Sequence, residues 1–225
     1  YEDAEMGKIL LVVSDKGGVG KSTYSANTAS MLANREKSVI ILKTDKNNDL
    51  ISWNEKRREN SLPTVPVYEA YGNVSKEINR LSKLCDVLIV DCPGHDSLEF
   101  RSALTVSDIM ITLVKASSDF ESETLTSVTE KVRMAQKSNA ALQPWVLLTR
   151  INPSKPRHRK AAIELDKLLR SDDVWIQPLK NRMSELDVFE SACNEGAGVH
   201  DVSRASSLTT AKAQIELVAQ EIGII

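Results

Sequence analysis

The residues with the clearest chemistry lie near the start of the chain, in the stretch KGGVGKST at residues 16–23. An apolar run at residues 9–13 precedes it, which predicts a buried strand that leads through a glycine-rich turn into a helix. Such a turn directs backbone N–H groups inward, and the helix N-terminus adds partial positive charge. Lys21 can then reach the β- and γ-phosphates of a nucleotide, and the Ser22 hydroxyl can bind Mg²⁺. The sequence therefore predicts a phosphate-binding loop made of Lys16, Gly17, Gly18, Val19, Gly20, Lys21, Ser22 and Thr23.

This loop departs from the usual pattern G-x-x-x-x-G-K-[ST], because Asp15 stands at the first glycine position and Lys16 is an additional lysine. In this form it resembles the signature K-G-G-x-G-K-[ST]-[ST] of the deviant Walker A ATPases, the ParA/MinD group, and it matches every fixed position. The resemblance implies that ATP and Mg²⁺ bind here. It also implies that Lys16 and Lys21 act in catalysis, and that Lys16 reaches across an ATP-dependent sandwich homodimer to stabilise charge on the partner's phosphates.

A second motif, DVLIVD at residues 86–91, ends an apolar run with a carboxylate and precedes Cys92-Pro93-Gly94. An acidic residue at the tip of a buried strand is a Walker B arrangement, in which Asp91 holds Mg²⁺ through water. Gly94 would leave a backbone N–H free to approach a γ-phosphate, as switch loops do. The alternative is that Asp91 only caps the turn before the next helix.

The third candidate is Asp45, in the stretch 39–48. In the resembled family this strand ends in a D-x-D-P-Q-like sequence whose second Asp orients the attacking water, and Asp45 matches that second Asp. The other positions differ, because Lys43 replaces the first Asp, Lys46 the Pro and Asn47 the Gln. A lysine at position 43 would place positive charge near the phosphates, and we expect it to alter or slow hydrolysis. An exposed polar loop is the alternative interpretation.

The stretch LLTRINP at residues 147–153 resembles a MinD segment of the form L-L-T-R-Y-N-P that follows a late strand near the purine. The resemblance implies that Arg150 and Asn152 lie close to the nucleotide. A strand that ends in an Asn-Pro turn explains the same residues without a ligand. The sequence has no N-K-x-D-type motif for guanine, so ATP is favoured over GTP.

The formal net charge of the chain is −2, which excludes a global positive field that would hold it on DNA. Contact with non-specific DNA therefore needs a local basic surface, whose binding would weaken with salt. A solvated helix start explains the densest cluster equally simply. The candidate DNA-contacting residues are Lys155, Arg157, Arg159, Lys160, Lys180, Arg182 and Arg204.

Apolar runs of strand length alternate with helical patterns, which predicts an α/β fold with a doubly wound, mostly parallel sheet and helices on both faces, as in P-loop NTPases. We expect one domain over residues 1–225, with a natural start at Met6 and residues 1–5 foreign to it. The expected strands are 8–13, 38–43, 65–68, 86–90, 109–114, 145–149 and 174–176. The expected helices are 21–34, 49–60, 74–84, 98–106, 121–138, 157–170, 184–194 and 205–222.

Cysteine content and hydropathy set limits on the protein's location. Cys85, Cys92 and Cys193 are odd in number and form no C-x-x-C pair, as is usual in a reducing cytoplasm. No apolar run reaches the ~20 residues of a membrane span. The segment 213–225 carries two Glu and no basic residue, which disfavours a membrane-binding amphipathic helix. We therefore expect a cytoplasmic protein that does not bind membranes.

Together these features predict a small ParA-type ATPase of DNA segregation. The resemblance implies that ATP closes a dimer, which binds non-specific DNA of the nucleoid and a centromere-binding ParB-type partner, and that slow, partner-stimulated hydrolysis resets it. A MinD-like membrane switch and a conjugation-linked ATPase are alternatives. A metabolic or redox enzyme of the same superfamily is another, because Cys92 lies in the expected switch loop.

Overall fold

The computed structural model describes residues 6–14, 16–115 and 121–225 of the chain. Residues 1–5, expected to precede the natural start, and Asp15, which marks the departure from the usual phosphate loop, lie outside the described residues. The predictions made for them are therefore not addressed by the structure.

The described residues form a six-stranded parallel sheet in the order β3-β2-β4-β1-β5-β6. This confirms the predicted doubly wound α/β class. Because β1 lies between β4 and β5, the loop that follows β1 emerges at the middle of the carboxyl edge, where ligands of such sheets bind. The strands are β1 Lys8–Ser14, β2 Val39–Lys43, β3 Val67–Glu69, β4 Val87–Pro93, β5 Ile109–Lys115 and β6 Gln143–Thr149.

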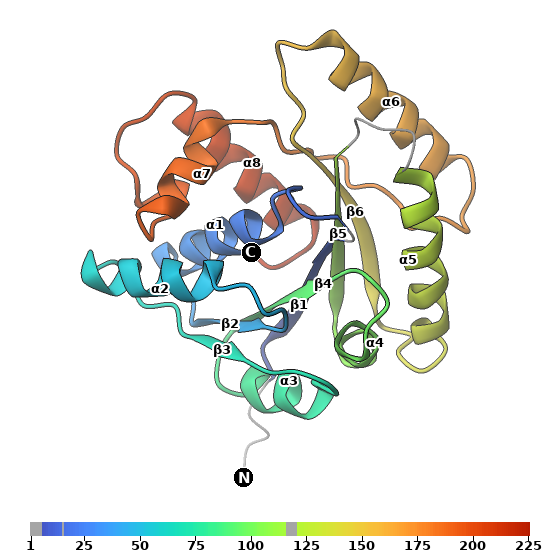
Figure 1. Cartoon of the computed structure of the whole chain (residues 1–225), viewed down its shortest axis with the longest axis horizontal. Coiled ribbons are helices and arrows are strands. Elements are labelled where there is room, and N and C mark those ends of the chain that lie inside the picture. The colour runs from blue at the N-terminus through green and yellow to red at the C-terminus, as the bar shows by residue number, and fades with distance from the viewer. Residues whose placement is uncertain (1–5, 15, 116–120) are drawn as a thin grey trace.

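Helices cover both faces of the sheet, as Figure 1 shows. Because side chains alternate along a strand, Leu10 and Val12 of β1 pack with α1, α2, α7 and α8, while Ile9 and Leu11 pack with α3, α4, α5 and α6. The helices are α1 Lys21–Asn34, α2 Asp49–Glu59, α3 Ser75–Ser82, α4 Leu98–Leu104, α5 Glu121–Gln136, α6 Pro156–Arg170, α7 Asp187–Asn194 and α8 Leu208–Glu221, with a 3₁₀ turn, η1, at Val199–Asp201.

The strand register fixes the height of the candidate site residues. Asp91 of β4 is in register with Val12 of β1 on one side and with Lys43 of β2 on the other. Asp91, Lys43 and the start of the glycine-rich loop therefore lie at the same edge of the sheet.

The predicted seventh strand at residues 174–176 is wrong. Residues 174–176 form no strand, and an isolated bridge follows them, between Pro178 and Val146. Arg133 of α5 donates hydrogen bonds to the carbonyls of Asp173, Val174 and Trp175 at 2.9–3.2 Å. These carbonyls are thus occupied by a side chain, and the short run does not join the sheet: Ile176 is buried, whereas Val174 is 64% exposed.

Two late helices begin further along the chain than their patterns predict. The pattern from residue 184 yields α7 only from Asp187, because Ser184 bridges to Ile151 and its N–H donates to Gln214 at 2.9 Å. The pattern from residue 205 yields α8 only from Leu208, because Ser207 takes a left-handed φ of 56° that ends the preceding turn.

Candidate nucleotide site

The glycine-rich loop wraps one side of a cavity of about 420 Å³ at the carboxyl edge of the sheet. Gly18 and Gly20 have φ angles of 77° and 94°, a left-handed conformation that only glycine adopts without strain. Gly20 directly precedes α1, so the helix N-terminus faces the cavity. The lining residues are Ser14, Lys16, Gly17, Gly18, Gly20, Lys21, Ser22, Thr23, Asp45, Asn47, Asp49, Pro93, His95 and Arg150.

Lys21, the first residue of α1, lines this cavity and joins two carboxylates. Its ammonium donates to Asp91 Oδ1 and lies 3.2 Å from Asp45 Oδ2. Burial alone would lower the pKa of Lys21, but the two carboxylates outweigh it and raise the pKa. Lys21 therefore stays cationic, and it brings together three residues that the sequence predicted as site residues.

Asp91 lies at the end of β4 with 0% of its surface exposed. Burial raises the pKa of its carboxyl, and the charge of Lys21 and the hydrogen bond from Ser25 at 2.9 Å offset only part of this rise. The sequence prediction missed Ser25. The signal was its position four residues after Lys21, which places both side chains on one face of α1.

Asp45 follows β2 and turns its carboxylate towards Lys21. Asn47 donates to Asp45 Oδ2 at 2.9 Å, so one carboxylate oxygen receives two hydrogen bonds. The other oxygen, Oδ1, is buried and accepts no hydrogen bond from the described residues. Asp45 thus presents one acceptor that is not engaged by hydrogen bonding, beside the phosphate-loop cavity.

Lys43 does not line the cavity, although the sequence led us to expect its charge near the phosphates. Its side chain is 1% exposed, and its ammonium donates to the backbone carbonyl of Asp45 and to Glu69 Oε1 at 3.0 Å. The hydrogen bond from Lys43 lowers the pKa of Glu69. The positive charge is therefore neutralised by an acidic residue of the neighbouring strand, β3.

A second cavity of about 210 Å³ lies on the other side of Arg150 and is more enclosed by apolar groups. Arg150 borders both cavities. Its φ of 51° is unusual for a residue with a side chain, and its buried Nε has no hydrogen-bond partner within the described ranges. The lining residues are Val19, Gly20, Thr23, Tyr24, Leu113, Thr149, Arg150, Met183, Ser184, Glu185, Leu186, Asp187, Phe189 and Glu190.

Asn152, the other residue expected near the nucleotide, does not line either cavity. Its amide donates to Glu185 Oε2 at 3.0 Å, and the hydrogen bond from Asn152 lowers the pKa of Glu185. Glu185 itself lines the second cavity. Asn152 therefore does not border the cavity itself but contacts a residue that does.

The segment after Asp91 does not present the free backbone N–H that the sequence led us to expect of a switch loop. The N–H of Gly94, expected to be free for a γ-phosphate, donates to the carbonyl of Ser14 at 2.9 Å. Cys92 is fully buried, and burial raises the pKa of its thiol to about 12. A buried, protonated thiol does not favour the iron–sulfur alternative, since clusters bind thiolates.

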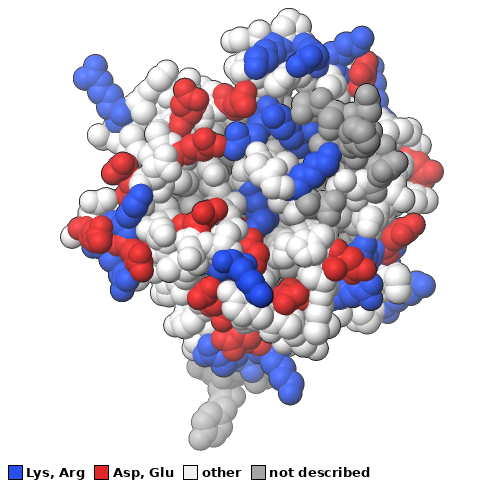
Figure 2. All heavy atoms as spheres, in the orientation of Figure 1, with Lys and Arg blue, Asp and Glu red and all other residues white. Residues whose placement is uncertain are grey.

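The basic residues expected to contact DNA divide between two regions. Lys155, Arg157, Arg159 and Lys160 are exposed on or beside the first turns of α6, and Figure 2 shows Lys and Arg gathered where this helix lies, at the top of the view. The exposed Lys180 and the half-buried Arg182 lie in the segment before α7, and Arg182 pairs with Asp166 of α6 at 3.3 Å. Arg204 lies in the η1–α8 loop, in the other helix layer.

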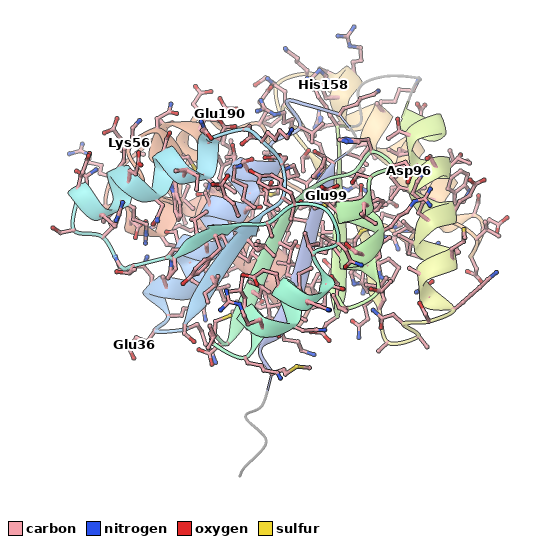
Figure 3. All side chains as sticks on the ribbon, turned by 60° about the horizontal axis from the view of Figure 1, so that its bottom comes forward. Glu36, Lys56, Asp96, Glu99, His158 and Glu190 are labelled. Atoms are coloured by element: carbon pink, nitrogen blue, oxygen red, sulfur yellow. The ribbon has the colours of Figure 1, made fainter. Side chains whose placement is uncertain are left out.

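The sequence prediction also missed Asp49, His95 and Glu190. Asp49 begins α2 and His95 follows β4, and both line the phosphate-loop cavity. Glu190 of α7, labelled in Figure 3, accepts a hydrogen bond from Arg150 and borders the second cavity. Asp49 and His95 follow strands whose carboxyl ends meet here, which is a readable signal. Glu190 offers none, because its helix reaches the site only through tertiary packing.

Ser22 and Asp91 supply the oxygen donors that a hard cation such as Mg²⁺ prefers. Ser22 lines the cavity, and the carboxylate of Asp91 lies behind the lining, in contact with Lys21. Among the described residues, no group of three or more His, Cys, Asp or Glu side chains could hold a metal ion by itself. The donor set therefore fits Mg²⁺ held jointly by this chain and a phosphate group.

The parallel sheet, the glycine-rich loop and the paired Lys21 and Asp91 define a P-loop nucleotide-binding protein. The family described as the CobQ/CobB/MinD/ParA nucleotide binding domain matches residues 10–185. The chain belongs to this family, and its group is that of the ParA/MinD ATPases. None of the helices in the described part of the chain is long and apolar enough to cross a bilayer.

Two curated relatives illustrate the range of roles in this group. The septum site-determining protein MinD of Synechocystis is 29% identical over 132 residues, which is 44% of this chain and 50% of MinD. The maintenance of carboxysome distribution protein A of Halothiobacillus neapolitanus is 22% identical over 193 residues, which is 84% of this chain and 85% of that protein.

Solved structures show the same fold at low sequence identity. An ATP complex of a Cyanothece McdA variant has a TM-score of 0.73 at 15% identity, covering 98% of each chain. A putative plasmid partition protein of Borrelia burgdorferi bound to AMPPNP has a TM-score of 0.68 at 18% identity, covering 96% of this chain and 99% of that one. MinD of Pyrococcus horikoshii with Mg-ADP has a TM-score of 0.67 at 20% identity, covering 97% and 98%.

Proposed function

We propose that this protein is an ATP-driven molecular switch that binds ATP with Mg²⁺, hydrolyses it slowly and serves in DNA segregation. The observation that carries the proposal is the position of Lys21 between the carboxylates of Asp91 and Asp45, beside the N-terminus of α1. A cation in that position, at the mouth of a glycine-rich loop, is suited to a polyphosphate.

The phosphates would lie in the 420 Å³ cavity, where the loop's backbone N–H groups and the ammonium of Lys21 bind them. Ser22 and Asp91 would hold Mg²⁺, which neutralises phosphate charge when it is bound. Lys21 must then exchange its hydrogen bond to Asp91 for the phosphate oxygens. Lys21 would then pair with the phosphates, and Mg²⁺ would take its place beside Asp91. The Asp91 carboxylate would therefore have a cation beside it both with and without nucleotide.

Asp45 would orient the water that attacks the γ-phosphate. Its Oδ2 is held by Asn47 and Lys21, whereas Oδ1 accepts no hydrogen bond from the described residues. A carboxylate that keeps unused acceptor capacity can accept a hydrogen bond from water and align it. Lys16 lines the same cavity, and in a sandwich dimer it would stabilise charge on the partner's phosphates.

The base would occupy the 210 Å³ cavity beyond Arg150, where apolar side chains such as Leu113, Met183 and Phe189 can contact the ring and polar side chains can bind its edge. Arg150 borders both cavities and has a buried, unpartnered Nε relative to the described residues. Nucleotide binding would give this group a partner. Asn152 would act indirectly by holding Glu185.

The role in DNA segregation rests on two further observations. The α6 surface carries exposed Lys155, Arg157, Arg159 and Lys160, which suit contact with DNA phosphates. A solved plasmid partition protein shares the fold over nearly the whole chain. The switch would bind non-specific DNA as an ATP dimer, associate with the nucleoid of the cytoplasm, and meet a centromere-binding ParB-type partner that stimulates hydrolysis.

A second candidate is a switch that positions a protein complex rather than a centromere. The similarity to carboxysome-distribution proteins, which extends over 98% of the chain in one solved structure, favours it. Both candidates share the ATP cycle and DNA contact. They differ only in the partner.

The central experiment compares ATP turnover of the wild type, Lys16→Ala and Asp45→Ala with and without duplex DNA, together with sedimentation in ADP and in a non-hydrolysable ATP analogue. We expect slow turnover by the wild type, loss of at least ~100-fold in Asp45→Ala, and an ATP-dependent dimer. A wild type that neither binds nor hydrolyses ATP would overturn the proposal. Equal DNA affinity in ADP and in the ATP analogue would overturn the proposal that ATP switches DNA binding on.

A further inference from the structure

Lys43 is a fully buried lysine at the carboxyl end of β2, two residues before Asp45. An ammonium removed from water needs partners that compensate its charge. Lys43 finds them across the strand pair, because it is in register with Glu69 of β3 and donates to the carboxylate of Glu69 at 3.0 Å. The side chain thus points along the edge of the sheet and not into the phosphate-loop cavity.

Tyr71 completes the surroundings of this ammonium. Its hydroxyl donates to Glu69 Oε1 at 2.8 Å and lies 3.4 Å from the carbonyl oxygen of Asp45. Its ring lies with its centre 6.0 Å from Lys43 Nζ, within the range of a cation–π contact. We call Lys43, Glu69 and Tyr71 the β2–β3 cluster.

The β2–β3 cluster contacts Asp45 through its backbone carbonyl. Lys43 donates to the carbonyl of Asp45, and Nζ lies 3.9 Å from Asp45 Oδ1, the carboxylate oxygen without a hydrogen bond. We infer that Lys43 is a positioning residue, which holds Asp45 in the orientation needed to align water. This inference rests on the proposed function, because it assigns Lys43 a part in ATP hydrolysis.

Electrostatics explains why a cation serves here. Asp45 and Asp91 both contact the ammonium of Lys21, so the two carboxylates lie close together and repel each other. Lys21 bridges them in this structure, but it must turn towards the phosphates when nucleotide binds. Lys43 is held by Glu69 of β3 and not by the nucleotide site. It would therefore stay beside Asp45 when nucleotide binds and keep a positive charge next to that carboxylate.

The test compares Lys43→Met with Lys46→Met, a matched control in which the exposed lysine of the same loop is replaced. Steady-state hydrolysis gives kcat and KM, a fluorescent ATP analogue gives affinity, and thermal unfolding gives stability. Met fills the buried space of Lys43 without its charge, and the partner that remains, Glu69, has a side chain that is 43% exposed, so water can solvate its carboxylate and little stability should be lost. Glu69→Gln provides a second variant that leaves Lys43 in place.

We expect Lys43→Met to lower kcat about tenfold, since small displacements of a catalytic group cost this much or more, with ATP affinity and Tm close to wild type. Glu69→Gln should lower kcat less, and Lys46→Met should leave it unchanged. An unchanged kcat in Lys43→Met would overturn the inference. So would a parallel loss of kcat, affinity and Tm, because that pattern indicates a merely structural role.

The Asp45→Ala variant separates this inference from the proposed function. If Asp45→Ala abolishes turnover while Lys43→Met keeps it, only the positioning role of Lys43 fails. If the wild type has no turnover, or Asp45→Ala retains it, the proposed hydrolytic mechanism fails and the role of Lys43 fails with it.

Discussion

Lys21 donates a hydrogen bond to Oδ1 of Asp91, a carboxylate with no exposed surface. The pair joins the first residue of α1 to the end of β4, so the charged centre of the site is built where a helix start meets a strand end. Lys21 has a second carboxylate within reach, that of Asp45, whereas the other group that contacts Asp91 is the neutral hydroxyl of Ser25. The site is therefore most sensitive to the loss of Lys21.

Lys21→Met should destabilise the nucleotide-free protein by about 3–5 kcal/mol at neutral pH, because it leaves a buried carboxylate without its cation. Burial raises the pKa of Asp91, so the folded state holds the proton more tightly than the unfolded state. The stability of the variant should therefore rise as the pH falls from neutrality towards the unfolded Asp pKa of about 3.9. Urea unfolding at several pH values measures this.

The double variant Lys21→Met, Asp91→Asn is the control for that prediction. It removes the buried charge together with its partner, so it should recover most of the lost stability at the upper end of the pH range. A deficit in Lys21→Met that is independent of pH, or no recovery in the double variant, would contradict the explanation.

Arg57→Met should cost about 3–5 kcal/mol in the free energy of unfolding. Arg57 of α2 pairs with Asp201 of η1 at 2.7 Å, and both side chains are almost fully buried. Burial would raise the pKa of Asp201, but hydrogen bonds from Arg57, Ser30 and the backbone outweigh it and lower the pKa. The contribution of this carboxylate is thus present above the unfolded Asp pKa of about 3.9 and is lost below it.

Denaturation of Arg57→Met at neutral pH and near pH ~3 tests this, because the deficit should be smaller at the acidic end. Arg58→Met is the matched control, since Arg58 is the next residue of α2 and is exposed. Its unfolding free energy should stay within about 0.5 kcal/mol of wild type. Equal losses in the two variants would show that the pair with Asp201 is not the cause.

Gly20→Ala should lower the stability of the nucleotide-free protein by about 1–2 kcal/mol, because a side chain is strained in the left-handed conformation. The φ of Gly20 is 94°, and an added Cβ would lie 3.8 Å from Arg150 Nε, so strain and not collision is the cause. Gly17→Ala is the control, because Gly17 has no positive φ and no atom within 4 Å of an added Cβ. Thermal unfolding of both variants should separate them, and equal Tm values would contradict the assignment.

Charge reversal on α6 should weaken DNA binding. Arg159→Glu and Lys160→Glu replace exposed cations of the first turns, and each lost phosphate contact should reduce the salt slope of binding by about 1. Lys76→Glu, on the exposed side of α3, makes the same charge change elsewhere and should leave the slope unchanged. Fluorescence anisotropy with duplex DNA at several salt concentrations measures it, and equal effects of all three would refute the α6 surface.

The sequence by itself determined the parallel α/β fold and most of the phosphate-loop cavity. Continuous apolar runs mark strands buried on both faces, and residues that follow such strands meet at one edge of the sheet. Lys21, Ser22, Asp45 and Asp91 could be placed together for this reason. The same reasoning failed at residues 174–176, because the backbone carbonyls there bind Arg133, which lies some forty positions earlier.

Tertiary structure alone decided the partners of the charged groups. The sequence predicts that Lys43 places a positive charge near the phosphates. The pairing of β2 with β3 instead places Glu69 beside Lys43 and directs its side chain away from the cavity. Arg150 and Glu190 meet because α7 packs against the end of β6, a contact between residues forty positions apart. Local patterns report periodicity and turn chemistry, whereas a buried charge takes whichever partner the packed elements bring within reach.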